Sequence, residues 1–143
     1  MTPVPRIVRP MRVEADNLPK LGTLSKCLGV REPGNADIDL DEVGKVQLNG
    51  RGLSVVSNWR LLPGFLVPPH LESEFNGASG RGLRVFVHGV GGFDEGDVAE
   101  GLCLRHKPGN DKAGNVTPTA SVPLAQFQAA LQATRTGWTI DET

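Results

Sequence analysis

The stretch Gly101-Leu-Cys-Leu-Arg-His106 predicts a strand, and the segment 115–120 predicts a second, shorter strand. Pro118 would place that second strand at the edge of a sheet, because proline cannot donate a ladder hydrogen bond. The stretch Val122-Pro-Leu-Ala-Gln-Phe-Gln-Ala-Ala-Leu131 comes next and predicts a helix. This order predicts a strand–strand–helix unit over Glu100–Thr143, which decides the fold class.

The predicted helix carries signals at both of its ends. Pro123 occupies a first-turn position, where the missing N–H needs no partner. Apolar side chains at i, i+3 and i+7 line one face of the helix: Leu124, Phe127 and Leu131. Gly137 marks the end of the pattern, so we expect a C-terminal helix over about 122–135.

The N-terminal part of the chain predicts less regular structure. Ile7–Val13 predicts a strand, in which Pro10 indicates an edge position or a bulge. Leu18–Val30 has apolar residues at helical spacing before Gly29, and it predicts a short helix.

The middle of the chain predicts strands, turns and one apolar loop. Residues 37–57 alternate apolar and polar side chains around two glycine turns, which predicts short strands joined by tight turns. The proline-broken segment 59–71 predicts a loop laid across the core, and Leu83–Val90 predicts a strand. The fold class is therefore α+β, a single domain over 1–143 with small antiparallel or mixed sheets and few short helices.

The charge balance and the apolar segments argue against several classes of protein. The chain has 15 basic and 16 acidic residues, so its net charge of −1 argues against a nucleic-acid partner. No segment approaches the ~20 apolar residues of a membrane span, and residues 1–10 lack the apolar core of a signal peptide. We expect a soluble protein, cytoplasmic or secreted into a target cell without a cleavable signal peptide. Cys27 and Cys103 are expected as free thiols.

The glycine-rich and acidic motifs do not complete any known ligand loop. Gly50-Arg-Gly-Leu-Ser54 lacks the Gly-Lys-Ser/Thr of a P-loop, and Gly89-Val-Gly-Gly-Phe93 lacks the following helix of a dinucleotide fingerprint. Asp37, Asp39 and Asp41 resemble the start of a calcium loop, but the glycine and the bidentate glutamate are missing. We therefore expect no metal.

A few side chains are candidates for chemistry. His88 or His70 could act as a general base, because the pKa of histidine lies near neutrality. Trp59 and Arg60 could form a stacking and cation–π platform for a nucleotide; alternatively, Trp59 anchors the proline-rich loop in the core. Ser54 could meet a ribose or serve as a polar strand residue.

Several short motifs follow one another in a defined order: Asp37-Ile38, Gly44-Lys-Val46, Gly52-Leu-Ser-Val55, Ala99-Glu-Gly-Leu-Cys-Leu-Arg105, Val116-Thr-Pro-Thr-Ala120 and the helical stretch from Val122. Their order resembles that of bacterial toxin effectors of type VI secretion systems whose fold is similar to NAD-dependent ADP-ribosyltransferases. The resemblance covers about Asp37–Leu131, mostly in its second half.

The resemblance implies an ADP-ribosyltransferase-like split β-sandwich that uses NAD as cofactor. Ser54 would lie in the NAD cleft, and Arg9 or Arg12 on the first strand would contact the cofactor. Ala113 stands five residues before Pro118, where the family has a histidine, and no glutamate falls in the family's catalytic pattern. An inactive relative is therefore an open alternative.

Two other functions stay open at this stage. The chain could be a non-catalytic protein-interaction domain, such as an immunity protein, an adaptor or a secretion-system cargo, with the apolar segment Leu61–Pro69 as its surface. Its partner would then be a cognate immunity protein or toxin. A small enzyme of another type, with His88 or His70 as its base, is the third interpretation.

Overall fold

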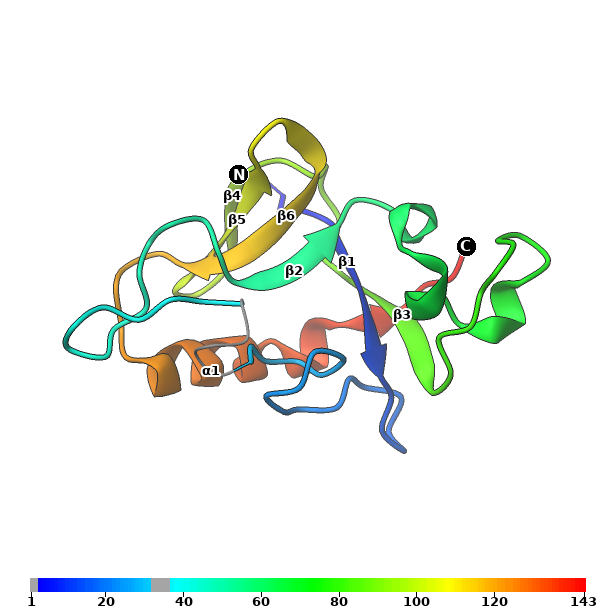
Figure 1. The fold of residues 1–143 in the computed structure, drawn as a ribbon, viewed down its shortest axis with the longest axis horizontal. Coiled ribbons are helices and arrows are strands. Elements are labelled where there is room, and N and C mark those ends of the chain that lie inside the picture. Colours follow the sequence, from blue (N-terminus) through cyan, green and yellow to red (C-terminus); the bar gives the residue numbers. More distant parts are fainter. Residues whose placement is uncertain (1–2, 32–36) are drawn as a thin grey trace.

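The computed structural model describes residues 3–31 and 37–143, whose strands form one antiparallel sheet with the order β4-β5-β6-β2-β1-β3-β7 (Figure 1). The strands are β1 (Ile7–Arg12), β2 (Leu53–Val56), β3 (Leu83–His88), β4 (Gly96–Ala99), β5 (Leu102–Lys107), β6 (Asn110–Pro118) and β7 (Thr139–Ile140). The helix is α1 (Leu124–Ala133), and short 3₁₀ turns lie at Trp59–Leu61, Gly64–Leu66, Pro69–Leu71 and Arg135–Gly137. The fold class is therefore α+β, as predicted.

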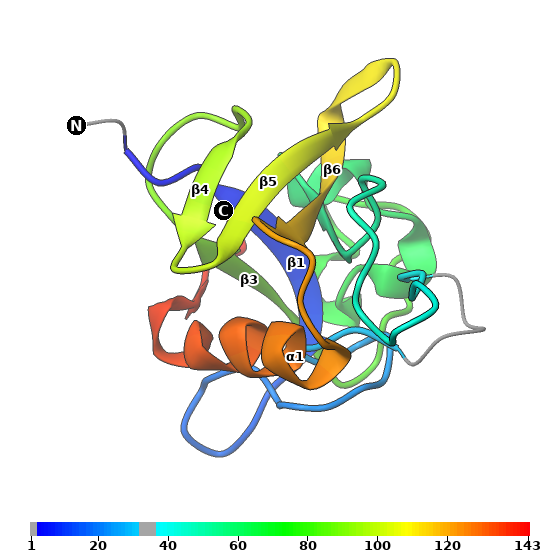
Figure 2. The ribbon, with the colours of Figure 1, turned by 90° about the vertical axis from the view of Figure 1, so that its left-hand side faces the viewer.

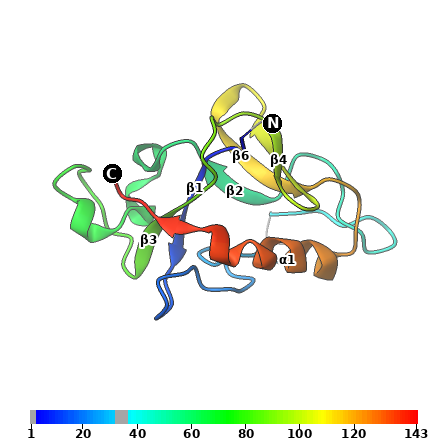
Figure 3. The same ribbon diagram turned by 180° about the vertical axis from the view of Figure 1, so that it is seen from behind.

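The predicted strand–strand–helix unit is confirmed at the C-terminal end of the chain. Strands β5 and β6 form a hairpin, which closes at the pair Lys107↔Asn110. Helix α1 begins after Pro123 and buries Phe127 and Leu131, within the predicted range 122–135. A 3₁₀ turn ends at Gly137, and the chain then returns as β7, which pairs with β3 and places the C-terminus beside that strand (Figure 3).

The two faces of the sheet are covered by different elements. Helix α1 lies across one face, where Ile7, Phe86 and Trp138 belong to the larger core (Figure 2). The segment 59–78 covers the other face, where it buries Trp59 and Val67 against the second core. The predicted loop across the core is therefore confirmed, and apolar burial on both faces stabilises the sheet.

The prediction that Pro118 lies on an edge strand is wrong, and so is the edge position that was one of the two alternatives, edge or bulge, for Pro10. Strand β1 lies between β2 and β3, and its pairing with β2 is confined to Val8↔Val56. Pro10 follows that pair, where the ladder with β2 is already open. Pro118 ends β6 beyond the last pair with β2, Leu53↔Val116, so it also interrupts no ladder on that side. Each proline needs only a local gap in the ladder.

The predicted helix over Leu18–Val30 is wrong, because this segment consists of turns and isolated bridges. Tertiary contacts use the backbone groups that a helix would need: the Arg12 N–H donates to the Lys26 carbonyl, and the Leu28 N–H donates to the Lys20 carbonyl. Long-range pairing has overridden the helical spacing of the leucines.

The alternating segment after residue 37 forms turns and one regular strand. Leu40 and Val46 form an isolated bridge, and β2 is the strand predicted around Leu53. Gly44 and Gly50 have φ values of +82° and +83°, which L residues with side chains rarely adopt. The tight turns predicted at these two glycines are confirmed.

None of the helices within 3–31 and 37–143 has the length and apolar character needed to cross a membrane.

Candidate functional site

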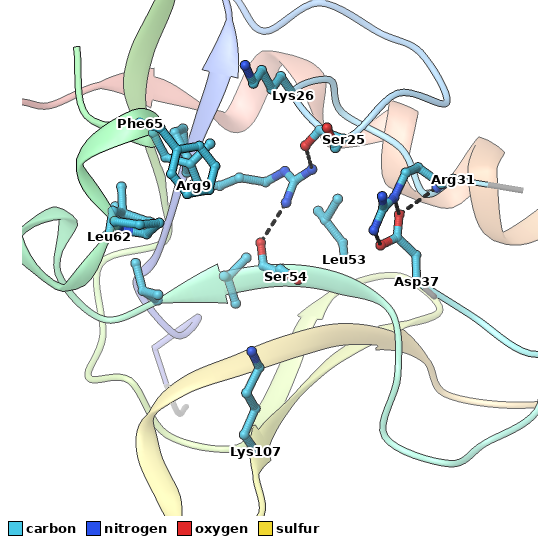
Figure 4. Close-up of a pocket in the computed structure, with 16 residues that line it drawn as sticks. Arg9, Ser25, Lys26, Arg31, Asp37, Leu53, Ser54, Leu62, Phe65 and Lys107 are labelled. Atoms are coloured by element: carbon cyan, nitrogen blue, oxygen red, sulfur yellow. Dashed lines mark hydrogen bonds and ion pairs between the residues drawn. The ribbon is translucent and has the colours of Figure 1, made fainter. Parts of the chain in front are cut away.

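A cavity of about 470 Å³ opens beside the point where β1 and β2 diverge (Figure 4). Its walls come from β1, β2, the segment around Ser25, and the 3₁₀ turns that follow β2. We call it the β1–β2 cavity. Its volume lies in the range of roughly 300–1,000 Å³ that is typical of small-molecule sites.

Arg9 lies at the centre of the β1–β2 cavity and is only 6% exposed. Its Nη1 donates to the Ser54 carbonyl at 2.8 Å. Its Nη2 donates to the carbonyls of Ser25 at 2.7 Å and Cys27 at 3.2 Å. The buried Nε has no hydrogen-bond partner among the described residues. The guanidinium thus bridges β2 and the 18–30 segment while its buried Nε–H stays unused.

Burial sets the charge state of Arg9. Removal from water lowers the pKa of its guanidinium to about 10, and the nearby Asp37 carboxylate counteracts part of that shift. Arg9 is therefore still a cation at neutral pH. No carboxylate within the described residues accepts a hydrogen bond from Arg9, so the three carbonyl dipoles carry its direct stabilisation.

Three further cations line the β1–β2 cavity: Lys26, Arg31 and Lys107. Asp37 also lines it, and Arg31 holds this carboxylate through Nε at 3.1 Å and Nη2 at 2.9 Å. Burial raises the pKa of Asp37, but the hydrogen bonds from Arg31 outweigh burial and hold the pKa below its ordinary value. The described lining thus contains four cations and one ionised carboxylate, which favours an anionic ligand.

An apolar wall faces these cations. Leu62 follows the first 3₁₀ turn after β2, Phe65 and Leu66 belong to the second, and Leu53 lies on β2 itself. Phe65 is 61% exposed, although it is a large apolar side chain. The cavity therefore combines a cationic side and an apolar side.

Two of the predicted site residues share the β1–β2 cavity, and a third does not. Arg9 and Ser54 line it together, with the exposed Ser54 side chain also bordering a shallow hollow beside Arg51 and Asn115. Arg12 lies at the far end of β1, opposite Leu83, and its exposed side chain lines none of the cavities described here. Of the two predicted arginines, only Arg9 faces the cavity.

Trp59 and Arg60 lie away from the β1–β2 cavity. Trp59 is buried, and its Nε1 donates to the Thr143 carbonyl at 3.0 Å. Arg60 stacks 4.4 Å from the centre of the Trp59 ring and pairs with Glu74 at 3.1 Å. The burial of Trp59 agrees with the interpretation that it anchors the proline-rich loop, and its ring already carries a cation.

His88 lies in a second cavity, on the helix face of the sheet. This groove of about 720 Å³ runs between α1 and the ends of β5 and β6. The His88 ring lies 5.3 Å from Trp138, and its buried Nδ1 has no partner among the described residues. Burial lowers the pKa of His88, so the ring is neutral at pH 7. His88 and Ser54 therefore belong to different cavities.

The other two histidines have local partners. His70 Nε2 lies 2.9 Å from Glu142 Oε1, and His106 Nε2 lies 2.7 Å from the Phe93 carbonyl. Across 3–31 and 37–143, no three metal-ligating side chains come together. Two carboxylates of the calcium-loop-like stretch form ion pairs: Asp37 pairs with Arg31, and Asp39 pairs with Arg51.

Sequence reasoning missed Lys26 and Lys107 as site residues, and it placed Phe65 only within the apolar segment Leu61–Pro69 of a candidate partner surface. No sequence motif surrounds any of these three residues. The two lysines belong to different segments, and Phe65 is one of several apolar residues in its segment. They meet only because β1 and β2 diverge and the 59–78 segment folds back over β1. The net charge of −1 could not reveal that four basic side chains gather around the β1–β2 cavity.

Comparisons of the chain with known protein families, curated proteins and solved structures found no match to any of them. The interpretation of the site therefore depends on its residues and their geometry.

Proposed function

We propose that this domain binds a small organic anion in the β1–β2 cavity. The observation that carries the proposal is Arg9, a buried cation whose Nε lacks a partner among the described residues and which lines a cavity together with Lys26 and Lys107. A buried donor without a partner is energetically unfavourable, and an acceptor on a ligand would relieve that cost. An anion would also balance the excess of cations around it.

NAD is the specific ligand that the family resemblance implies. Arg9 and Ser54, the residues that the resemblance assigns to an NAD cleft, line the same cavity. The pyrophosphate of NAD would match the cations, and its rings would match the apolar wall. An ADP-ribosyltransferase-like form of the α+β fold belongs to the same proposal.

Calorimetric titration with NAD tests this assignment. We expect saturable binding to the wild type and weaker binding to the double variant Lys26→Gln/Lys107→Gln. The matched control is Lys20→Gln/Lys45→Gln, which removes the same charge from exposed lysines outside the cavity. Equal affinities of the two double variants would show that NAD does not bind at this site.

A toxin-like ADP-ribosyltransferase is the second candidate, favoured by the position of Ser54 in the cavity with Arg9. The reaction would break the bond between nicotinamide and ribose, pass ADP-ribose to an acceptor nucleophile and release nicotinamide. Among the described residues, Asp37 is the carboxylate that lines the cavity, and Arg31 already pairs with it. Because this carboxylate is engaged, we expect slow transfer of ADP-ribose, or binding of NAD without transfer. The measurements are toxicity on expression in bacteria and transfer of labelled ADP-ribose, each compared with Ser54→Ala.

A non-catalytic interaction domain is the third candidate, and two exposed apolar side chains favour it. Leu61 and Phe65 are 51% and 61% exposed within the segment that covers β1 and β3. Such exposure is typical of a partner surface when it is contiguous. A stoichiometric immunity protein or toxin captured by the wild type, and lost with Leu61→Ser, would support this function.

A further inference from the structure

We infer that the anion bound in the β1–β2 cavity is amphipathic, with one acidic group and an apolar chain or ring attached to it. This inference depends on the proposed anion-binding function and adds the chemical class of the ligand. It follows from the division of the cavity into a cationic side and an apolar side (Figure 4).

The cationic side is formed by Arg9 with two lysines that approach from different elements. Lys26 comes from the segment before Cys27, and Lys107 comes from the end of β5. Figure 4 shows these two lysines on opposite sides of the Arg9 guanidinium. Among the described residues, no carboxylate pairs with either ammonium group. An acidic group placed here would meet three cations that have no anionic partner in contact among the described residues.

The apolar side is formed by Leu62, Phe65 and Leu66, which Figure 4 shows in part through the labelled Leu62 and Phe65. Phe65 is 61% exposed, and hydrogen bonds hold the backbone on both sides of it. The Ser79 N–H donates to the Gly64 carbonyl at 2.9 Å, and the Gly80 N–H donates to the Val67 carbonyl at 2.8 Å. The exposed ring therefore belongs to an ordered wall, and apolar ligand atoms would cover it.

Simpler ligands leave one side of the cavity unsatisfied. Inorganic phosphate would pair with the cations and leave the Phe65 wall in water. A neutral apolar molecule would cover Phe65 and leave the Arg9 Nε without an acceptor. An amphipathic anion satisfies both sides, and the cavity of about 470 Å³ can enclose a molecule of that kind.

Titration calorimetry with inorganic phosphate, ethyl phosphate, butyl phosphate and hexyl phosphate tests the inference. We expect the affinity to rise along the series, by up to about fourfold for each CH₂ that is fully buried. Phe65→Ser should flatten this rise and leave the affinity for inorganic phosphate unchanged. Val90→Ser is the matched control, because Val90 is 88% exposed and lies outside the cavity. Hexanol should not bind.

The outcomes separate this inference from the proposed function. Binding of all four phosphates with one affinity, or a rise that Phe65→Ser leaves intact, would overturn the amphipathic ligand and keep the anion site. Binding that Lys26→Gln/Lys107→Gln leaves unchanged, or no binding of any phosphate, would overturn the anion site itself. A rise with chain length that Phe65→Ser flattens, together with weaker binding of the phosphates to Lys26→Gln/Lys107→Gln, supports both the amphipathic ligand and the anion site.

Discussion

The Arg9 guanidinium donates to the Ser54 carbonyl at 2.8 Å, and this side-chain contact stands where β1 and β2 no longer pair through their backbones. A buried side chain has thus replaced part of a ladder between neighbouring strands. The two strands diverge at this point, and residues of both line the β1–β2 cavity. The same residue is therefore expected to matter for folding and for ligand binding.

Arg9→Ala should destabilise the fold by about 1–3 kcal/mol. The substitution leaves the carbonyls of Ser54, Ser25 and Cys27 without their donor, and a lost hydrogen bond in a buried place is costly. Urea unfolding followed by tryptophan fluorescence measures the free energy of unfolding.

Arg12→Ala is the control for this measurement, because Arg12 lies on the same strand with an exposed side chain. Its free energy of unfolding should stay within about 0.5 kcal/mol of the wild type. Similar losses for the two variants would contradict the structural role assigned to Arg9.

Gln128 on α1 acts as a backbone partner for Val30. Its Oε1 accepts from the Val30 N–H at 3.0 Å, and its Nε2 donates to the Val30 carbonyl at 2.6 Å. Gln128→Ala should cost about 1–3 kcal/mol, because both backbone groups lose their partner in a partly buried place. Gln126→Ala on the exposed side of the helix should change the unfolding midpoint little, and a comparable loss there would count against this assignment.

Local patterns in the sequence predicted the regular elements well. The apolar spacing of Phe127 and Leu131 identified α1, and the glycines at 44 and 50 identified two turns, because these signals depend on neighbouring residues. Pro10 and Pro118 were misplaced because the position of a strand within a sheet depends on partners far along the chain. The segment Leu18–Val30 was misassigned for the same reason.

The candidate site was predicted only in part. Arg9 and Ser54 were proposed through a family resemblance, and the structure places them in one cavity. Lys26 and Lys107 stand 81 positions apart in the sequence, and no motif links them. Their convergence depends on the fold, so spacing along the chain carried no information about it.

Glu142 should give the fold a pH dependence in the acid range. Burial raises its pKa, but hydrogen bonds from Arg84, His70 and the Val85 N–H outweigh burial and hold the pKa below its ordinary value of 4.5. A depressed pKa stabilises the fold above about pH 4.5, and the stabilisation is lost as the pH falls through the folded-state pKa.

Glu142→Gln measures this contribution directly. At pH 7 the variant should be less stable than the wild type by about 1–2 kcal/mol, and the difference should shrink at pH 3. Glu72→Gln, at an exposed position, should match the wild type at both pH values. A constant difference between Glu142→Gln and the wild type from pH 7 to pH 3 would argue against an ionised Glu142 as the cause.

His88 should give a separate pH dependence nearer neutrality. Burial lowers its pKa below the ordinary value of 6.5, so the folded state resists protonation while the unfolded chain accepts a proton. Stability should therefore fall as the pH drops below 6.5, by at most about 1.4 kcal/mol per pH unit. Thermal unfolding between pH 7.5 and 5 should show this fall for the wild type and for His70→Leu, and a smaller fall for His88→Leu. An NMR titration of the ring with a midpoint at or above 6.5 would refute the neutral, buried state of His88.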